Sequence, residues 1–367
     1  MRRHSLQKLM PEYIKNFEAY TPSKPDAELA KIYNCKKIYR LNNNENFLGP
    51  PAAAIEVIRK FDPKRAALYP SGDSLYLRFK LAQKFHKDPD QFLVGNGANE
   101  VIGFTLKAFC EQGDNIITAD KTFAVYEWTA VFSGIEARLA PLKNFDLDDE
   151  GMLKLMDART KIIFICNPNN PTGTYWNSQK LRQFIQKVDG RAVIVVDEAY
   201  HEFVEKEDYP DSMSLINEYP NLVTFRTFSK MYGLAGLRIG YLAGNHEIVD
   251  IIRRTCIVYS VNTLAQDAAL IAVDDDGHVM ATRRLVKEGK AFLTDELAKI
   301  GLPYQCGEGN YLMVKLPIDD GLAYRKLMTS GVMVRTMTGF RFPNYIRVTI
   351  SSPEAMEALI AGLVKIV

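Results

Sequence analysis

Short apolar runs rich in β-branched residues alternate with stretches of helical periodicity through the middle of the chain. This alternation predicts an α/β fold with a mainly parallel sheet covered by helices. The expected strands are residues 92–94, 115–118, 161–166, 192–196 and 222–228. Between them, residues 98–110 and 178–188 place apolar side chains at near-helical spacing, as expected of helices that bury one face against a sheet.

The pattern changes after about residue 258. A long helical segment over residues 264–300 is followed by expected strands at 311–316, 332–336 and 345–350, which predict a smaller α+β domain. Residues 1–51 hold five prolines and the first 50 residues show little periodicity, so these 50 are expected to form an extended arm. We therefore predict an arm over residues 1–50, a large domain over 51–258 and a small C-terminal domain over 259–367.

Composition narrows the class of protein. The chain has 367 residues, of which 47% are hydrophobic and 25% charged, and its net charge is +2, so no broad field for nucleic acid or an anionic membrane is expected. No apolar run approaches the roughly 20 residues of a membrane helix, and the first ten residues are not followed by a signal-peptide pattern.

Cysteine and histidine usage bears on location and metals. The five cysteines are odd in number and never form a CxxC pair, which favours reduced thiols in the cytoplasm. The five histidines show no metal-ligand spacing, so no metal is expected.

The segment from Thr227 to Gly240 concentrates hydroxyl, basic and glycine residues directly after an apolar strand. Thr227, Ser229 and Arg238 have the hydrogen-bond donors that hold a phosphate. Lys230, among cations, is expected to have a depressed pKa and to be able to form an imine with an aldehyde. An exposed basic loop is the alternative.

An acidic residue, Asp197, ends another buried strand, and Tyr200 follows it. Sites in parallel sheets lie at the carboxyl ends of strands, and a carboxylate there could keep a pyridine nitrogen protonated while Tyr200 bonds a phenolic oxygen of the ring. The alternative is that Asp197 only caps the next helix.

Two turn-rich segments also follow strands. Residues 166–173, with the sequence CNPNNPTG, leave Asn170 free to donate toward a ligand, although the composition equally fits a plain turn. Residues 95–100, GNGANE, open a helix whose first amides, at Ala98 and Asn99, could bind phosphate, but they do not match the dinucleotide motif GxGxxG.

Arg335 and Arg347 lie in apolar strand contexts near the C-terminus. A charge in such a place is costly unless it meets an anion, so both are candidates for an anion site. Structural pairing with one of the 44 acidic residues is the alternative.

Taken together, these segments resemble fold-type I pyridoxal-phosphate (PLP) aminotransferases, most closely the histidinol-phosphate aminotransferase branch. The resemblance covers nearly the whole chain. Its motifs occur in the family's order, and they are FEAYTPSKPDAEL, IYRLNNNENFLGPP, LYPSGDSLYLR, GNGANE, NPNNPTG, VVDEAY, TFSKMYGLAGLRIGY and VRTMTGFRFPNYIRVTI.

The resemblance implies a role for each candidate. Lys230 is implied to bind PLP covalently and to act as general acid and base, Asp197 to pair with the pyridine nitrogen, and Asn170 and Tyr200 to bond the phenolic oxygen. Phe123 is implied to stack on the ring. The residues implied to hold the phosphate are Ala98, Asn99, Thr227, Ser229 and Arg238.

The resemblance also implies a homodimer with shared sites. Tyr69 would reach the partner's cofactor phosphate and Tyr20 its substrate pocket. Arg347 would bind the substrate carboxylate and Arg335 the distal anion, with Asn46 also implied at the substrate. Departures from the family's usual residues touch the pocket, and they are Asn99, Phe123, Leu48 and Thr336.

The activity implied is transfer of the amino group of L-histidinol phosphate to 2-oxoglutarate, with aromatic amino acid transamination as the alternative. A decarboxylase on the same scaffold is a further reading, because the cofactor stabilises whichever carbanion the pocket creates. A ligand-sensing module of a transcription regulator would need a DNA-binding domain, which the arm is neither basic nor long enough to supply.

Overall fold

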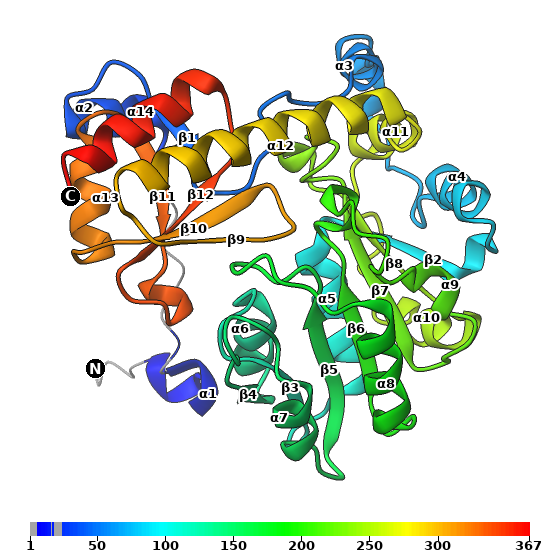
Figure 1. Cartoon of the computed structure of the whole chain (residues 1–367). Helices are drawn as coiled ribbons and strands as arrows, with labels where there is room; N and C mark the ends of the chain where they lie inside the picture. The colour runs from blue at the N-terminus through cyan, green and yellow to red at the C-terminus, as the bar shows by residue number, and fades with distance from the viewer. Residues whose placement is uncertain (1–5, 16, 18–23) are drawn as a thin grey trace, which may run out of the picture.

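A large, mostly parallel sheet forms the centre of the protein. The computed structural model describes residues 6–15, 17 and 24–367, and within them this sheet has seven strands (Figure 1). In spatial order they are β2 (Phe92–Gly95), β8 (Gly240–Gly244), β7 (Leu222–Thr227), β6 (Val193–Asp197), β5 (Thr160–Cys166), β3 (Asn115–Ala119) and β4 (Glu136–Ala140). In the described residues β8 is antiparallel to both β2 and β7, and the other neighbouring pairs are parallel. The predicted mainly parallel sheet is confirmed.

Helices cover this sheet, and α8 illustrates why they form where they do. The Asn177 side chain accepts a hydrogen bond from the Lys180 amide and caps the first turn. Leu181, Phe184, Ile185 and Val188 then repeat at helical spacing and are buried. The helices of this part are α3 (Ala52–Arg59), α4 (Leu75–Phe85), α5 (Ala98–Phe109), α6 (Val125–Phe132), α7 (Asp149–Lys154), α8 (Ser178–Val188), α9 (Ser212–Leu215) and α10 (His246–Arg253).

A smaller sheet lies toward the C-terminus and includes one strand from the arm (Figure 1). Its order is β1 (Tyr39–Leu41), β11 (Val332–Thr336), β12 (Tyr345–Thr349), β10 (Tyr311–Lys315) and β9 (Tyr304–Cys306). The pair β1–β11 is parallel and the other pairs are antiparallel. The helices α12 (Asp276–Lys299), α13 (Asp320–Met328) and α14 (Pro353–Val364) accompany this sheet. The expected α+β character of this part is confirmed.

Two expectations for single segments are wrong. Residues 264–300 form two helices, α11 (Thr263–Ala272) and α12, because the Asp275 side chain accepts a bond from the His278 amide and caps a new helix. The arm is not simply extended, since α1 (Glu12–Lys15) and α2 (Asp26–Tyr33) are helical. Leu29 of α2 is buried in a cluster with Met328 and Met333. The helix α2 therefore packs against α13 and β11 of the small sheet's part of the molecule.

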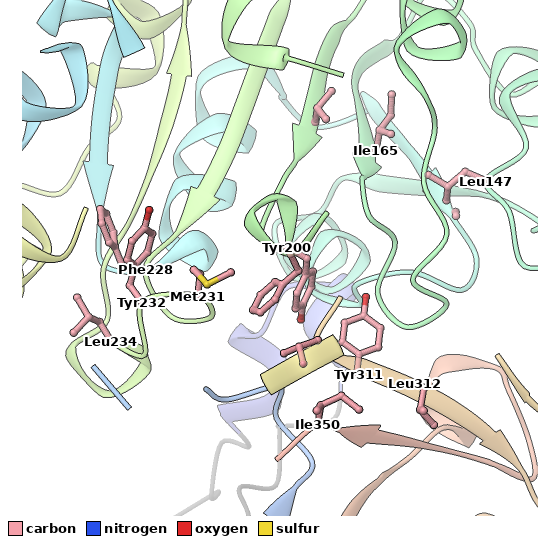
Figure 2. Packing of buried hydrophobic residues seen from close by; sticks show 14 of the residues in the cluster. Leu147, Ile165, Tyr200, Phe228, Met231, Tyr232, Leu234, Tyr311, Leu312 and Ile350 are labelled. Carbon is pink, nitrogen blue, oxygen red and sulfur yellow. The ribbon is translucent and has the colours of Figure 1, made fainter. Parts of the chain in front are cut away.

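One apolar core continues from the large sheet into the small one. A single cluster holds Ile163 and Ile165 of β5 together with Ile346 and Val348 of β12. Figure 2 shows residues of this cluster, including Tyr200, Tyr311 and Ile350, where the two sheets approach each other. The shared core therefore fixes the carboxyl ends of the large sheet's strands against the small sheet. No helix among the described residues is both long and apolar enough to span a bilayer.

Candidate active site

A cavity of about 460 Å³ lies where these strand ends meet the small sheet, a size typical of small-molecule sites. β5, β6 and β7 end at Cys166, Asp197 and Thr227, which all line it, as expected at the carboxyl edge of parallel strands. Most of the predicted site residues line this one cavity, and they are Ala98, Asn99, Phe123, Asn170, Asp197, Tyr200, Thr227, Ser229, Lys230, Arg238, Arg335 and Arg347.

Asp197 is a buried carboxyl group held by two hydrogen bonds. The Tyr126 hydroxyl donates to its Oδ2 at 2.5 Å, and the Ala199 amide donates to its Oδ1 at 3.0 Å. Burial raises the pKa of Asp197 to about 6, while these bonds and the nearby Lys230 act in the opposite direction. Asp197 is therefore largely ionised at neutral pH despite its burial. Sequence reasoning missed Tyr126, whose only signal was its place three residues after Phe123.

Lys230 follows β7 and donates from Nζ to the Asn43 carbonyl oxygen at 2.7 Å. The pKa of Lys230 is lowered to about 8, and burial is the main cause. The neighbouring Arg347 and Arg238 lower it further. The expected lowering is confirmed, although cations are not its main cause. A useful fraction of the amine is therefore neutral and nucleophilic near neutral pH.

Arg347 is buried without a carboxylate. Its Nη1 donates to Asn170 Oδ1 at 2.5 Å and its Nη2 to the Asn42 carbonyl at 2.8 Å, while its Nε has no partner. Within the described part of the chain, no acidic side chain forms an ion pair with Arg347 or Arg335, so neither has the structural partner offered as an alternative. A buried guanidinium without a carboxylate partner has the charge and the donors that suit an anion.

Arg335 lies directly opposite Arg347 in the antiparallel pair β11–β12. Residues opposite each other point to the same face of a sheet, and both arginines line the cavity. The Arg335 guanidinium lies 5.5 Å from the centre of the Phe340 ring. The cavity therefore has two cationic groups on one wall, and Phe340 adds an aromatic surface beside them.

A second group of donors gathers at the start of α5. Gly97, with φ +82°, precedes the helix, and a Cβ built there would lie 2.4 Å from Arg238 Nη2, so only glycine lets the guanidinium approach this backbone. Arg238 Nη1 lies 3.5 Å from Ser229 Oγ, and the Ser229 amide donates to Thr227 Oγ1 at 3.1 Å. A helix N-terminus, two hydroxyls and a guanidinium together suit a phosphate dianion.

Two predicted residues, Asn46 and Tyr69, do not line this cavity. Asn46 instead donates to the Met231 carbonyl at 2.7 Å and to Thr282 Oγ1 at 3.1 Å. Tyr69 is 82% exposed and its ring stacks on Tyr259 at 4.7 Å. Tyr20 lies outside the described residues.

The cavity wall near Lys230 also includes Asn43, Asn44 and Glu45, which sequence reasoning did not single out. The signal available was the asparagine run directly after the β1 sequence.

The fold and the cavity define an α/β protein in which a buried lysine, a buried carboxylate, a pair of arginines and the donors at the start of α5 line one cavity. Residues 36–363 match the family described as aminotransferase class I and II. The chain belongs to the class I and II aminotransferase family.

Named relatives agree with this. The chain is 36% identical to the histidinol-phosphate aminotransferase of Moorella thermoacetica over 96% of this chain and 91% of that protein. It is 38% identical to that of Caldicellulosiruptor saccharolyticus, over 92% and 94%. In structure it is similar to the Sinorhizobium meliloti histidinol-phosphate aminotransferase in complex with pyridoxal-5'-phosphate, with a TM-score of 0.86, 22% identity and 97% of each chain covered.

Proposed function

We propose that the cavity binds PLP and that the protein is a PLP-dependent transaminase. The observation that carries this proposal is that one cavity is lined by Lys230, Asp197, Tyr200 and Asn170. Hydrogen-bond donors suited to a phosphate, at the start of α5 and on Arg238, line the same cavity. When bound, PLP supplies an electrophilic aldehyde carbon and a ring that withdraws electrons. The amine, the carboxylate and the phosphate-binding donors of the cavity complement the aldehyde, the ring nitrogen and the phosphate of PLP.

Each side chain has a role that its surroundings support. Lys230, with its lowered pKa, is the amine that attaches the cofactor, and once released it moves a proton at the substrate carbon as base and then acid. Asp197, ionised and held by Tyr126, keeps the ring nitrogen protonated. Asn170 and Tyr200 orient the phenolic oxygen, and Phe123 covers one face of the ring.

We propose L-histidinol phosphate as amino donor and 2-oxoglutarate as acceptor, giving imidazole acetol phosphate and L-glutamate by a ping-pong route in histidine biosynthesis. The names of the relatives support this substrate. The cross-strand pair Arg335 and Arg347 supports it as well, because 2-oxoglutarate and glutamate carry two carboxylates and histidinol phosphate carries a phosphate. The Arg347 Nε without a partner offers a further donor to such an anion.

A homodimer that shares its sites is part of the proposal. Exposed apolar side chains gather around the stacked rings of Tyr69 and Tyr259 and along α4, and they are Leu68, Tyr69, Leu75, Tyr76, Phe79, Ile257, Val258 and Tyr259. An apolar area of this kind is typical of a surface covered by a partner. We infer that a second copy covers it, with Tyr69 and Tyr20 serving the partner's site. The unpaired cysteines favour the cytoplasm.

Single-turnover absorbance tests the proposal. Purified protein loaded with PLP is expected to show a visible band of the lysine-bound cofactor, and Lys230→Ala is the control that should lack it while keeping weakly bound PLP. Histidinol phosphate should bleach the band faster than phenylalanine at equal concentration. Faster bleaching by phenylalanine would make the protein an aromatic amino acid aminotransferase, and absence of the band in the unsubstituted protein would refute the proposal.

A further inference from the structure

Asn44 connects the arm and the small sheet to a candidate cofactor residue. Asn44 lines the cavity, and its side chain donates from Nδ2 to the Tyr200 hydroxyl oxygen at 2.8 Å. Its own amide donates to Thr349 Oγ1 of β12 at 2.9 Å. Three segments far apart in sequence thus meet at one buried point, with Asn44, Tyr200 and Thr349 each 3% exposed or less.

The hydrogen bonds set the direction of the Asn44 amide. Thr349 Oγ1 accepts from the Asn44 backbone and lies 3.2 Å from Asn44 Oδ1, to which it donates its proton. With its oxygen held by Thr349, Asn44 presents its NH₂ group to Tyr200. The opposite orientation would leave the Thr349 proton without this acceptor, which is costly in a buried place.

The direction of the Asn44 amide in turn decides what Tyr200 does. A phenol has one proton to donate, and here its oxygen accepts from Asn44. In the part of the chain that the structure describes, this is the hydrogen bond recorded for the Tyr200 hydroxyl, and Tyr200 lines the cavity. Its proton is therefore available to a ligand in the cavity, and the bond it accepts makes it a stronger donor.

We propose that Asn44 and Thr349 are positioning residues that turn the Tyr200 proton toward the phenolic oxygen of the bound cofactor. The inference rests on the proposed function, since it needs a cofactor in the cavity. Asn44 makes the contact with Tyr200, and Thr349 holds Asn44 in the orientation that can donate. The small sheet thereby acts on the cofactor's electronic state without touching it.

The test is a pH titration of the visible band of the lysine-bound cofactor. A hydrogen bond to the phenolic oxygen stabilises the form in which the lysine-linked nitrogen has lost its proton, because that form carries more negative charge on the oxygen. Tyr200→Phe should therefore raise the pKa of the band by about 1 to 2 units. Thr349→Val and Asn44→Ala should each raise it by about 0.5 to 1 unit, since they weaken this donor without removing it.

The double variants decide the question. Combined with Tyr200→Phe, neither Thr349→Val nor Asn44→Ala should move the band further, because their effect passes through the lost hydroxyl. Thr349→Ser keeps the hydroxyl and should behave as the unsubstituted protein. Arg347 and Asp197, the charged groups that act most on Tyr200, are unchanged throughout.

Asn44 has φ +57°, which Ala adopts at a cost, so the Thr349 variants stand on their own if Asn44→Ala does not fold. A shift of equal size in the Tyr200→Phe background would overturn the inference, as would an unmoved band in Thr349→Val. Absence of the band from the unsubstituted protein would overturn the proposed function and this inference with it.

Discussion

Replacing Asp197 with Asn is expected to stabilise the ligand-free protein at neutral and alkaline pH while abolishing its activity. Asp197 is 2% exposed, and burial raises its pKa to about 6 from an ordinary value near 3.8. An amide of the same shape can still accept the bond from the Ala199 amide at its oxygen, and its NH₂ group can donate to the Tyr126 hydroxyl oxygen. It carries no charge, so the cost of burying the ionised carboxylate disappears.

The sign and size follow from the shifted pKa. A group whose pKa is higher in the folded state contributes most to stability below its unfolded pKa, and the contribution is lost as pH rises through the folded value. For Asp197 the window is about pH 4 to pH 6. A difference of about 2 units corresponds to roughly 3 kcal/mol by 1.36 kcal/mol per unit. Relative to Asp197→Asn, the unsubstituted protein should therefore lose roughly 2 to 3 kcal/mol between pH 4 and pH 8.

Urea unfolding of both ligand-free proteins at pH 4, 5, 6, 7 and 8 measures this difference directly. The comparison between pH values removes any constant effect of the amide. A difference in unfolding free energy that stays flat across this range would refute the reasoning, because it would mean that Asp197 has an ordinary pKa in the fold. Normal turnover in Asp197→Asn would refute the role of its charge.

Three further predictions concern neighbouring groups. Tyr126→Phe removes a bond to a buried carboxylate, so the pKa of Asp197 should rise by about 1 to 2 units. The measurement is the pH dependence of binding of 4-deoxypyridoxine phosphate, an analogue without the aldehyde. The pH below which its affinity falls should rise by the same amount. The rate of PLP attachment should increase with pH around pH 8, the pKa of Lys230, and Arg347→Met should move that midpoint upward because a neighbouring positive charge is removed; an unmoved midpoint would contradict this. Gly307→Ala should lower the unfolding free energy by about 1 to 3 kcal/mol, because its Cβ would lie 2.3 Å from backbone of the turn that carries Asn170; an unchanged thermal midpoint would show that the turn yields.

Residues that end strands were predictable from sequence, and residues that depend on contacts between distant segments were not. Lys230 and Asp197 follow apolar strands, and the rule that sites form at strand ends placed them in one site. Tyr126 resembles an ordinary core aromatic until its hydroxyl is seen to meet Asp197. Asn46 looked like a site residue, yet its amide is used by Met231 and Thr282 inside the fold.

Secondary structure shows the same division. β8, with the sequence GYLAG, has weak strand propensity, and it forms because it pairs on both edges with β2 and β7. The break between α11 and α12 falls at residues 274–277, DDDG, where the Asp275 side chain caps the new helix. Local pattern does not predict β8, because tertiary pairing overrides its weak propensity, whereas the break at residues 274–277 has a local signal in its polar run.

The small sheet contributes side chains both to the cavity wall and to the hydrogen bonds behind it. Arg335 and Arg347 come from its strands, and Thr349 of the same strand β12 holds Asn44 against Tyr200. β12 therefore links the anion subsite and the orientation of Tyr200 through residues two positions apart, which point to the same face. A displacement of β12 on substrate binding would change both at once, so the proposed anion subsite and the proposed orientation of Tyr200 depend on the position of one strand.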